Sequence, residues 1–162
     1  MRERFKTPSA VFIMLFRKNN GIQEILLQRR QNTGYMDNFW DLSASGHVEK
    51  DESMTEAVIR ETKEEIGINI VRSDIKFACF TYAKFDLTYC YIYFCASNWS
   101  GTPVIKEPQK CSALKWFDVN NLPQNMIPDR KTTVLNYLKG IYFGEFGWKN
   151  ENSILRPRWN NY

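Results

Sequence analysis

Histidine is almost absent from this sequence of 162 residues, because His47 is the only one. A Ser-His-Asp or Cys-His catalytic arrangement would have to use His47, and no recognisable nucleophile motif lies near it. This scarcity excludes most hydrolase mechanisms that pass through a covalent intermediate. We expect His47 to be a solvent-facing histidine in a loop.

The sequence also lacks the cysteine spacing of a metal or redox site. Its cysteines form no C-x-x-C pair and have no companion histidines at zinc spacing; they are Cys79, Cys90, Cys95 and Cys111. We expect them to be reduced thiols in strands and in a loop of a cytoplasmic protein.

No apolar run is long enough to span a bilayer. Ala10–Phe16 follows a basic start, which imitates a secretory signal, but no small-residue cleavage site comes after it. Asn-Asn-Gly at residues 19–21 predicts a turn, so Ala10–Phe16 and Glu24–Gln28 are better interpreted as a buried hairpin. The net charge of +4 does not by itself predict a nucleic-acid partner. We therefore expect no membrane association and no stable nucleic-acid partner.

The sequence is rich in glutamate between residues 46 and 68. Ser53 and Glu56 form a capping box, which predicts a helix that begins at about Met54, and Gly67 suits the left-handed conformation at its end. With about 100° of rotation per residue, the helix has one apolar stripe. The stripe consists of Met54, Val58, Thr62 and Ile66, and Ile59 widens it.

Glu61, Glu64 and Glu65 lie together beside this apolar stripe, within an arc of about 100°. Carboxylates crowded at the border of a buried face repel one another unless a cation lies between them. Mg²⁺ suits this position, with Mn²⁺ as a substitute, because it takes oxygen ligands and shares its remaining sites with water and phosphates. The alternative is a solvated acidic face of the helix.

The spacing within this stretch follows the pattern G-x5-E-x7-R-E-T-x-E-E-x-G-I from Gly46 to Ile68. This pattern resembles the Nudix box, and the chain resembles the MutT-like Nudix hydrolases over about residues 8–140. One departure is Thr62, where the family usually has an aliphatic residue. The resemblance implies an α+β fold, an α/β/α sandwich with a mixed β-sheet and a loop–helix–loop.

The remaining sequence predicts the strands and helix of such a fold. Aromatic and β-branched runs at Ile75–Tyr82 and Tyr89–Ala96 predict a long hairpin, and Leu114–Val119 predicts a further strand. Arg130–Lys139 is a short predicted helix. We expect one domain over residues 1–162. Its aromatic C-terminal extension, residues 141–162, would pack on the sheet, cover the cleft or join a homodimer.

The resemblance also implies roles for single residues. The implied metal ligands are Glu61, Glu64, Glu65, the backbone carbonyl of Ser45 in a turn over residues 43–46, and Glu107 in a later loop. Glu61 or Glu64 would serve as the general base, and Glu107 could instead be a charged loop residue. Arg60 would orient the glutamates by charge pairing. Glu52 would support the loop behind the metal ligands.

Three further residues are candidates for substrate binding. Arg29 could pair with phosphate oxygens. Trp40 could stack on a base or form part of the core. Asp129 lies in a Pro-Asp segment that resembles the base-reading segment of oxidised-purine nucleotide hydrolases; alternatively, it is the N-cap of its helix.

These residues predict a Mg²⁺-dependent pyrophosphohydrolase that cleaves a nucleoside diphosphate linked to another moiety. We expect a nucleoside triphosphate as the substrate, either a standard nucleotide or an oxidised or non-standard one. The alternative substrates are ADP-ribose and nucleotide sugars. A non-catalytic nucleotide-binding regulator is a further alternative, but the intact Arg60-Glu61 and Glu64-Glu65 pairs argue against it.

Overall fold

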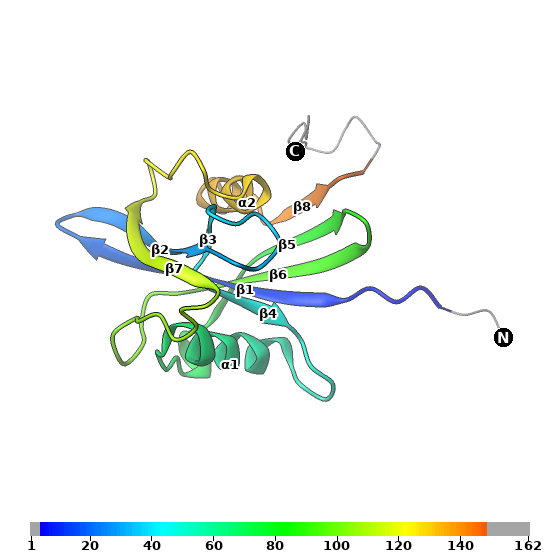
Figure 1. Cartoon of the computed structure of the whole chain (residues 1–162), viewed down its shortest axis with the longest axis horizontal. Helices are drawn as coiled ribbons and strands as arrows, with labels where there is room; N and C mark the ends of the chain where they lie inside the picture. The colour runs from blue at the N-terminus through cyan, green and yellow to red at the C-terminus, as the bar shows by residue number, and fades with distance from the viewer. Residues whose placement is uncertain (1–3, 149–162) are drawn as a thin grey trace.

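The computed structural model of the chain describes residues 4–148, and strand β1 (Ser9–Asn19) runs through the middle of its sheet (Figure 1). Side chains of β1 alternate between two buried clusters. Ala10, Phe12, Met14 and Phe16 belong to one cluster, and Val11, Ile13 and Leu15 belong to the other. Because β1 is buried on both faces, its sequence is a continuous apolar run.

The predicted hairpin is confirmed by strand β2 (Ile22–Arg30), which pairs antiparallel with the second half of β1. Asn20 and Gly21 form the turn with φ angles of 49° and 82°. Two positive φ angles match the turn twist that hairpins prefer, which explains the Asn-Gly sequence.

The described strands form an eight-stranded mixed sheet in the order β3-β2-β1-β6-β5-β8, with β4 paired to β1 and β7 paired to β2. The other strands are β3 (Trp40–Leu42), β4 (Ala44–His47), β5 (Lys76–Lys84), β6 (Thr88–Ala96), β7 (Cys111–Asp118) and β8 (Phe143–Phe146). The pairs β1–β6 and β5–β8 are parallel, and the other pairs are antiparallel. The mixed sheet predicted from sequence is confirmed.

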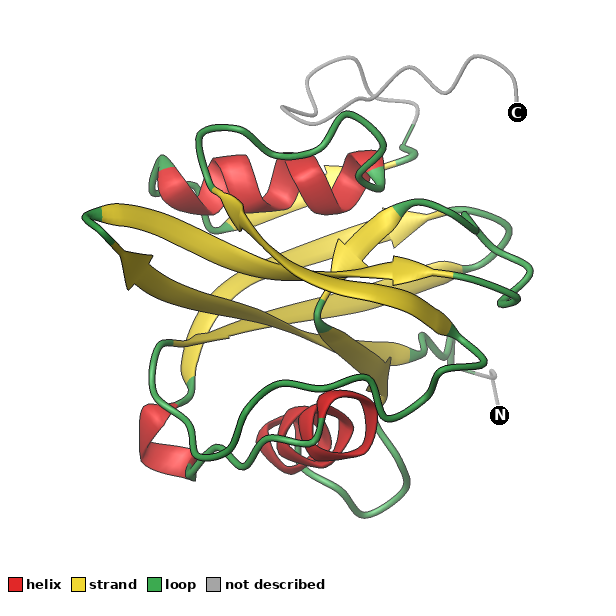
Figure 2. Cartoon of the chain, turned by 60° about the vertical axis from the view of Figure 1, so that its left-hand side comes forward, coloured by secondary structure: helices red, strands yellow, loops and turns green. Residues whose placement is uncertain are grey.

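Two helices cover opposite faces of the sheet, as Figure 2 shows. Helix α1 (Met54–Ile66) buries Ala57, Val58 and Ile66 in the cluster that contains Val11 of β1. Helix α2 (Pro128–Leu138) contributes Val134 to the cluster on the other face. A short 3₁₀ helix, η1 (Arg72–Asp74), follows α1. No helix within residues 4–148 is long and apolar enough to cross a membrane.

Helix α1 follows its sequence signals at both ends. The backbone N–H of Glu56 donates to Ser53 Oγ, the backbone N–H of Ser53 donates to the Glu56 carboxylate, and Gly67 has a φ of 73°. Thr62 is buried, and its hydroxyl donates to the Val58 carbonyl at 2.6 Å, so a polar residue fits the apolar stripe. The prediction for Met54 was wrong, because its side chain is 42% exposed in the first turn.

Three local predictions were wrong. The segment expected as a turn over residues 43–46 is mostly strand β4, which pairs with the first half of β1. Helix α2 begins at Pro128, two residues earlier than predicted. Its N-cap is Ile127 without a side-chain cap, so Asp129 lies inside the first turn and does not serve as the N-cap.

The described part of the aromatic extension packs on the edge of the sheet. Strand β8 pairs with β5, and the Trp148 ring stacks on Tyr82 with 5.1 Å between ring centroids. The extension from residue 149 onward lies outside the described residues.

All four cysteines are free thiols and lie in strands, including Cys111, which begins β7. The expectation that one would lie in a loop was wrong.

Candidate active site

Arg60 is the centre of a charge network on the exposed side of α1. Its Nε and Nη2 atoms donate to the two carboxylate oxygens of Glu52 at 2.8 and 3.1 Å. Its Nη1 donates to Glu61 at 2.6 Å and to Glu64 at 3.2 Å. A further bond from Nη2 to the His47 carbonyl ties the end of β4 to the helix. Arg60 therefore holds Glu61 and Glu64 in place, and Glu52 in turn fixes Arg60.

Glu61 lies directly against β4. A Cβ atom added to Gly46 would overlap the Glu61 carboxylate, so glycine at this position leaves the space that the carboxylate occupies. Burial raises the pKa of Glu61, and the hydrogen bond from Arg60 opposes that rise. The side chain of Glu61 is 14% exposed, which makes it one of the less accessible carboxylates of the box.

Glu65 lies deeper than the other glutamates on helix α1. Its Oε2 atom accepts hydrogen bonds from the Ser45 backbone N–H at 3.1 Å and from Gln28 Nε2 at 3.2 Å. Burial raises the pKa of Glu65 to about 8; the Ser45 hydrogen bond lowers it, and the charges of Glu61 and Glu107 raise it further. Three carboxylates thus influence one another at this site.

The loop before β7 brings Glu107 to this cluster. Its backbone is fixed to the end of α1, because Val104 N–H donates to the Ile66 carbonyl and Lys106 N–H donates to the Glu65 carbonyl, each at 3.0 Å. The ammonium group of Lys110 contacts both carboxylate oxygens of Glu107, at 3.1 and 3.2 Å. Sequence reasoning found Glu107 but missed Lys110.

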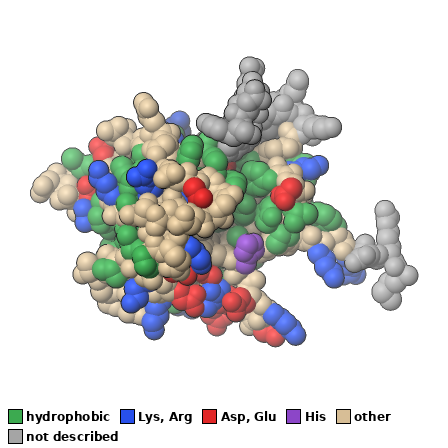
Figure 3. Space-filling model, in the orientation of Figure 1, with side chains coloured by type: hydrophobic (Ala, Val, Ile, Leu, Met, Phe, Trp, Pro, Cys, Tyr) green, Lys and Arg blue, Asp and Glu red, His purple; other side chains and the backbone are tan. Residues whose placement is uncertain are grey.

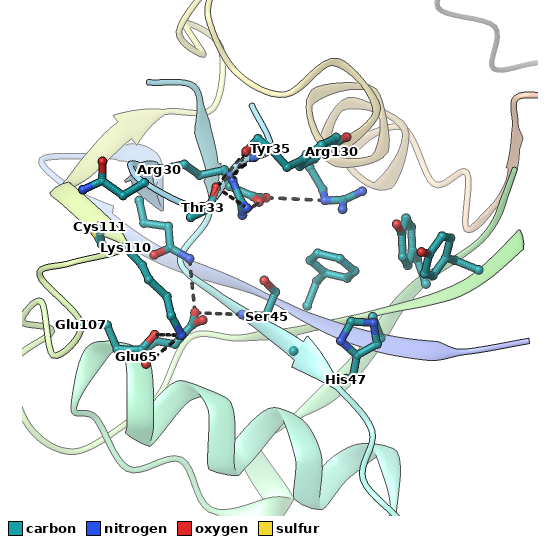
Figure 4. Close-up of a pocket in the computed structure, with 18 of the residues that line it drawn as sticks. Arg30, Thr33, Tyr35, Ser45, His47, Glu65, Glu107, Lys110, Cys111 and Arg130 are labelled. Carbon is teal, nitrogen blue, oxygen red and sulfur yellow. Dashed lines mark hydrogen bonds and ion pairs between the residues drawn. The ribbon is translucent and has the colours of Figure 1, made fainter. Parts of the chain in front are cut away.

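A cavity of about 760 Å³ opens beside these residues. Figure 4 shows Glu65, Glu107 and Lys110 on one side of it, and Tyr35 and Arg130 across from them. In Figure 3 the acidic side chains gather next to His47, over α1. His47 ends β4 and lines the cavity with an exposed side chain, so the expectation of a loop histidine was wrong while that of solvent exposure was right.

Glu64 lies at the outer edge of this arrangement. Its side chain is 57% exposed and does not line the cavity. Within residues 4–148, no three His, Cys, Asp or Glu side chains converge closely enough to form a metal cage by themselves. The structure places Ser45, Glu65 and Glu107 in the cavity lining. Glu61 lies behind that lining against Gly46, and Glu64 lies beside it at the surface.

Comparison with known proteins identifies the family of the chain. The model of the NUDIX domain matches residues 6–137. The chain belongs to the Nudix family. A putative 8-oxo-dGTP diphosphatase of Bacillus subtilis is 31% identical over 121 residues, which cover 75% of each chain.

Solved structures of Nudix proteins share the fold. The MutT Nudix hydrolase from Burkholderia pseudomallei has a TM-score of 0.70 and 25% identity, covering 81% of this chain and 98% of that one. The Nudix domain of NrtR from Shewanella oneidensis, solved with ADP ribose, has a TM-score of 0.67 and 18% identity, covering 85% and 90%. The chain is thus a MutT-like Nudix hydrolase, a pyrophosphohydrolase by family.

In this Nudix enzyme, Arg29 does not line the cavity, contrary to its predicted role. Its guanidinium bonds to the Asn38 carbonyl at 3.3 Å, on the outer side of β2. Arg30, the next residue, lines the cavity instead and pairs with Asp41 at 3.1 Å. Successive residues of a strand point to opposite faces, so a shift of one position exchanges the two arginines.

Trp40 and Asp129 also lie outside the cavity lining. The Trp40 ring packs edge-on against Phe117 with 4.7 Å between centroids, in the core cluster on the α2 side. This placement favours the packing interpretation over stacking on a base. Asp129 is fully buried and pairs with its neighbour Arg130, which does line the cavity.

Proposed function

We propose that this Nudix enzyme hydrolyses a phosphoanhydride bond of a nucleoside triphosphate and releases a nucleoside monophosphate and pyrophosphate. The observation that supports it most is the composition of one cavity. Partly buried carboxylates line one side, where Glu65 and Glu107 lie, and aromatic rings and arginines line the other. A polyphosphate with its counter-ions fits the first side, and a flat base fits the second.

We further propose that Mg²⁺ is held by Glu61, Glu65, Glu107 and the Ser45 carbonyl, with Glu64 completing the set. The residues fit this ion because they offer only oxygen donors. The space over Gly46, which lines the cavity, accommodates the Glu61 carboxylate. Burial raises the pKa of Glu65, and the nearby charges of Glu61 and Glu107 raise it further, so a cation between these carboxylates would relieve their repulsion. The bound metal would neutralise phosphate charge and stabilise the charge that develops at phosphorus.

The protein residues have separate tasks in this mechanism. A water oxygen attacks phosphorus, its proton passes to the carboxylate of Glu61 or Glu64, and the bridging P–O bond breaks with its electron pair on the departing oxygen. The leaving group is pyrophosphate for attack at the α-phosphorus and the nucleoside monophosphate for attack at the β-phosphorus. Arg60 holds both candidate bases through Nη1. Lys110 and Arg30 supply positive charge to the cavity for the substrate phosphates.

A hydrolysis screen with product identification tests this proposal. The purified chain is incubated with Mg²⁺ and nucleoside triphosphates, ADP-ribose, nucleotide sugars and dinucleotides. We expect monophosphate plus pyrophosphate from a triphosphate. Two monophosphates from ADP-ribose, with intact triphosphates, would contradict the proposed substrate and support the alternative.

A further inference from the structure

Aromatic rings line the part of the cavity next to α2 and the β5–β6 turn. The rings belong to Phe12, Tyr35, Phe85, Tyr89 and Tyr91. Phe12 meets Tyr91 edge-on with 5.1 Å between centroids, and Tyr89 stacks on Tyr91 at 5.6 Å. Rings arranged in this way fit the flat, apolar faces of a nucleobase but do not distinguish one base from another.

Arg130 is the charged group that enters this aromatic part of the cavity. Its side chain comes from the first turn of α2 and is 6% exposed. The guanidinium carbon lies 4.1 Å from the centre of the Phe12 ring and 4.6 Å from that of Tyr91. Figure 4 shows the guanidinium projecting into the cavity, below Tyr35 and above Ser45. Cation–π contacts with both rings thus fix the position of the planar guanidinium.

Only part of this guanidinium is used within the described protein. Nη1 donates to Tyr93 Oη at 3.2 Å and to Asp129. Nε is buried without a hydrogen-bond partner among residues 4–148 and lies 3.5 Å from Asp41 Oδ1 in a looser ion pair. A further side-chain hydrogen bond joins Arg130 to Tyr91. A guanidinium has five N–H donors, and these contacts take up at most four of them, so one N–H of this cavity-lining group is left for a ligand.

Both carboxylate oxygens of Asp41 are engaged, whereas Asp129 Oδ1 is buried without a hydrogen-bond partner among residues 4–148. Asp41 Oδ2 accepts from Arg30 at 3.1 Å, and Asp41 Oδ1 accepts from the Leu42 backbone N–H at 2.7 Å. Asp129 is fully buried and does not line the cavity. At Arg130 the cavity wall therefore presents hydrogen-bond donors, and the two carboxylates that contact Arg130 are either engaged, as in Asp41, or outside the lining, as in Asp129.

We propose that Arg130 determines base specificity by donating to a keto oxygen, so that the enzyme prefers nucleotides with keto bases over those with amino bases. This inference rests on the proposed function. A guanidinium has only donors, so an amino group placed against it would leave two donors facing each other in a buried site. A site built to form such a bond discriminates strongly against analogues that cannot accept it.

Two matched substrate pairs test the proposal with the unmodified protein. Inosine and adenosine triphosphates differ by a keto or amino group on the six-membered ring, with the accompanying ring proton, and uridine and cytidine triphosphates differ in the same way. We expect kcat/KM to be at least about tenfold higher for the keto member of each pair. Equal values, or a preference for the amino member, would overturn the role of Arg130.

Binding of monophosphates separates this inference from the proposed function. We expect inosine monophosphate to bind at least about tenfold more tightly than adenosine monophosphate in calorimetry. If that preference is found but no triphosphate is hydrolysed, the proposed function fails and the base selection stands. If triphosphates are hydrolysed without any base preference, the proposed function stands and this inference fails.

A variant then assigns the preference to Arg130. Arg130→Gln made together with Asp129→Asn removes the cation and its buried partner charge at once, which avoids an unpaired carboxylate. We expect the keto preference to fall close to one in this folded double variant. Lys131→Gln is the matched control, since Lys131 lies on the same helix, bonds to the Pro123 carbonyl and does not line the cavity.

Arg130→Lys covers the case in which the double variant does not fold, because it keeps the buried charge but has a different donor geometry. A reduced keto preference is expected there too. An unchanged preference in either folded variant would show that the buried pair of Arg130 and Asp129 serves stability alone.

Discussion

Glu65 is the residue on which the metal proposal depends most directly. A glutamine at this position keeps an oxygen that can accept from Ser45 and Gln28 but removes the charge. We expect Glu65→Gln to lower turnover by about 100-fold or more, because a neutral amide is a poor Mg²⁺ ligand. The melting temperature should not fall, since the variant no longer buries an ionisable group.

Glu56→Gln is the matched control for this measurement. Glu56 lies on the same helix but is exposed, and a glutamine preserves its capping bond to the Ser53 N–H. Turnover of Glu56→Gln should equal that of the unmodified protein. Near-normal turnover in Glu65→Gln would remove Glu65 from the metal site.

Trp40 gives a second prediction at this scale. Because its ring packs on Phe117 in the core and does not line the cavity, Trp40→Ala should act on stability. We expect a loss of about 2–4 kcal/mol in the free energy of unfolding by urea titration. KM for the nucleotide should stay within about twofold. A large rise in KM at unchanged stability would instead show that Trp40 stacks on the base.

The sequence located the carboxylates of the site better than the residues on the opposite side of the cavity, where the nucleobase is proposed to bind. Glu61 and Glu65 were identified because helical spacing and the box pattern fix them within one element. Arg30 was missed in favour of Arg29, since a strand's register cannot be read to a single residue without its pairing partners. Arg130 was not among the predicted site residues, because its position depends on contacts with Phe12 and Tyr91 of two distant strands.

At the scale of the elements, the contact between β4 and α1 sets the geometry of the site. Gly46→Ala should push the Glu61 carboxylate away from its place, since the new methyl group would overlap it. We expect turnover to fall by at least about tenfold and stability to fall by no more than about 1 kcal/mol, because the overlapped atoms are the flexible end of the Glu61 side chain. Circular dichroism and thermal melting would measure the second effect. Normal turnover in this variant would contradict the assigned contact between Gly46 and Glu61.

Helix α1 could be predicted from local sequence signals, whereas strand β4 depends on pairing with a distant strand and could not. The helix carries its own stop and start signals in Ser53, Glu56 and Gly67, all within its own sequence. Strand β4 exists because it pairs with β1, more than thirty residues earlier in the chain. Such long-range pairing leaves little trace in four residues of sequence, Ala-Ser-Gly-His.

For the whole molecule, the acidic cluster makes stability depend on pH and metal together. The pKa of Glu65 is raised from 4.5 to about 8, so the folded state binds a proton that the unfolded state has already released between these values. Its contribution to stability is fully present below about pH 4.5 and is lost as the pH rises through about 8. Without metal, we expect the melting temperature to fall between pH 5 and pH 8.5, and Glu65→Gln should flatten this decline.

Carboxylates with lowered pKa values affect stability in a different pH range. Hydrogen bonds from Arg60 lower the pKa of Glu52, and those from Thr33 lower the pKa of Asp37. Their contributions are present above the ordinary pKa and are lost as the pH falls, so they do not mask the decline above pH 5. A melting temperature that stays flat or rises from pH 5 to pH 8.5 would contradict the buried position of Glu65.

A magnesium titration at about pH 8, followed by both thermal melting and turnover of a nucleoside triphosphate, tests the central claim most directly. At 100-fold excess over the dissociation constant, binding stabilises a protein by about 2.7 kcal/mol, which corresponds to about 5–10 °C at this size. We predict that melting temperature and turnover rise together with the same half-saturating concentration, and that neither responds in Glu65→Gln. If saturating magnesium leaves both unchanged in the unmodified protein, the glutamate cluster is not a metal site.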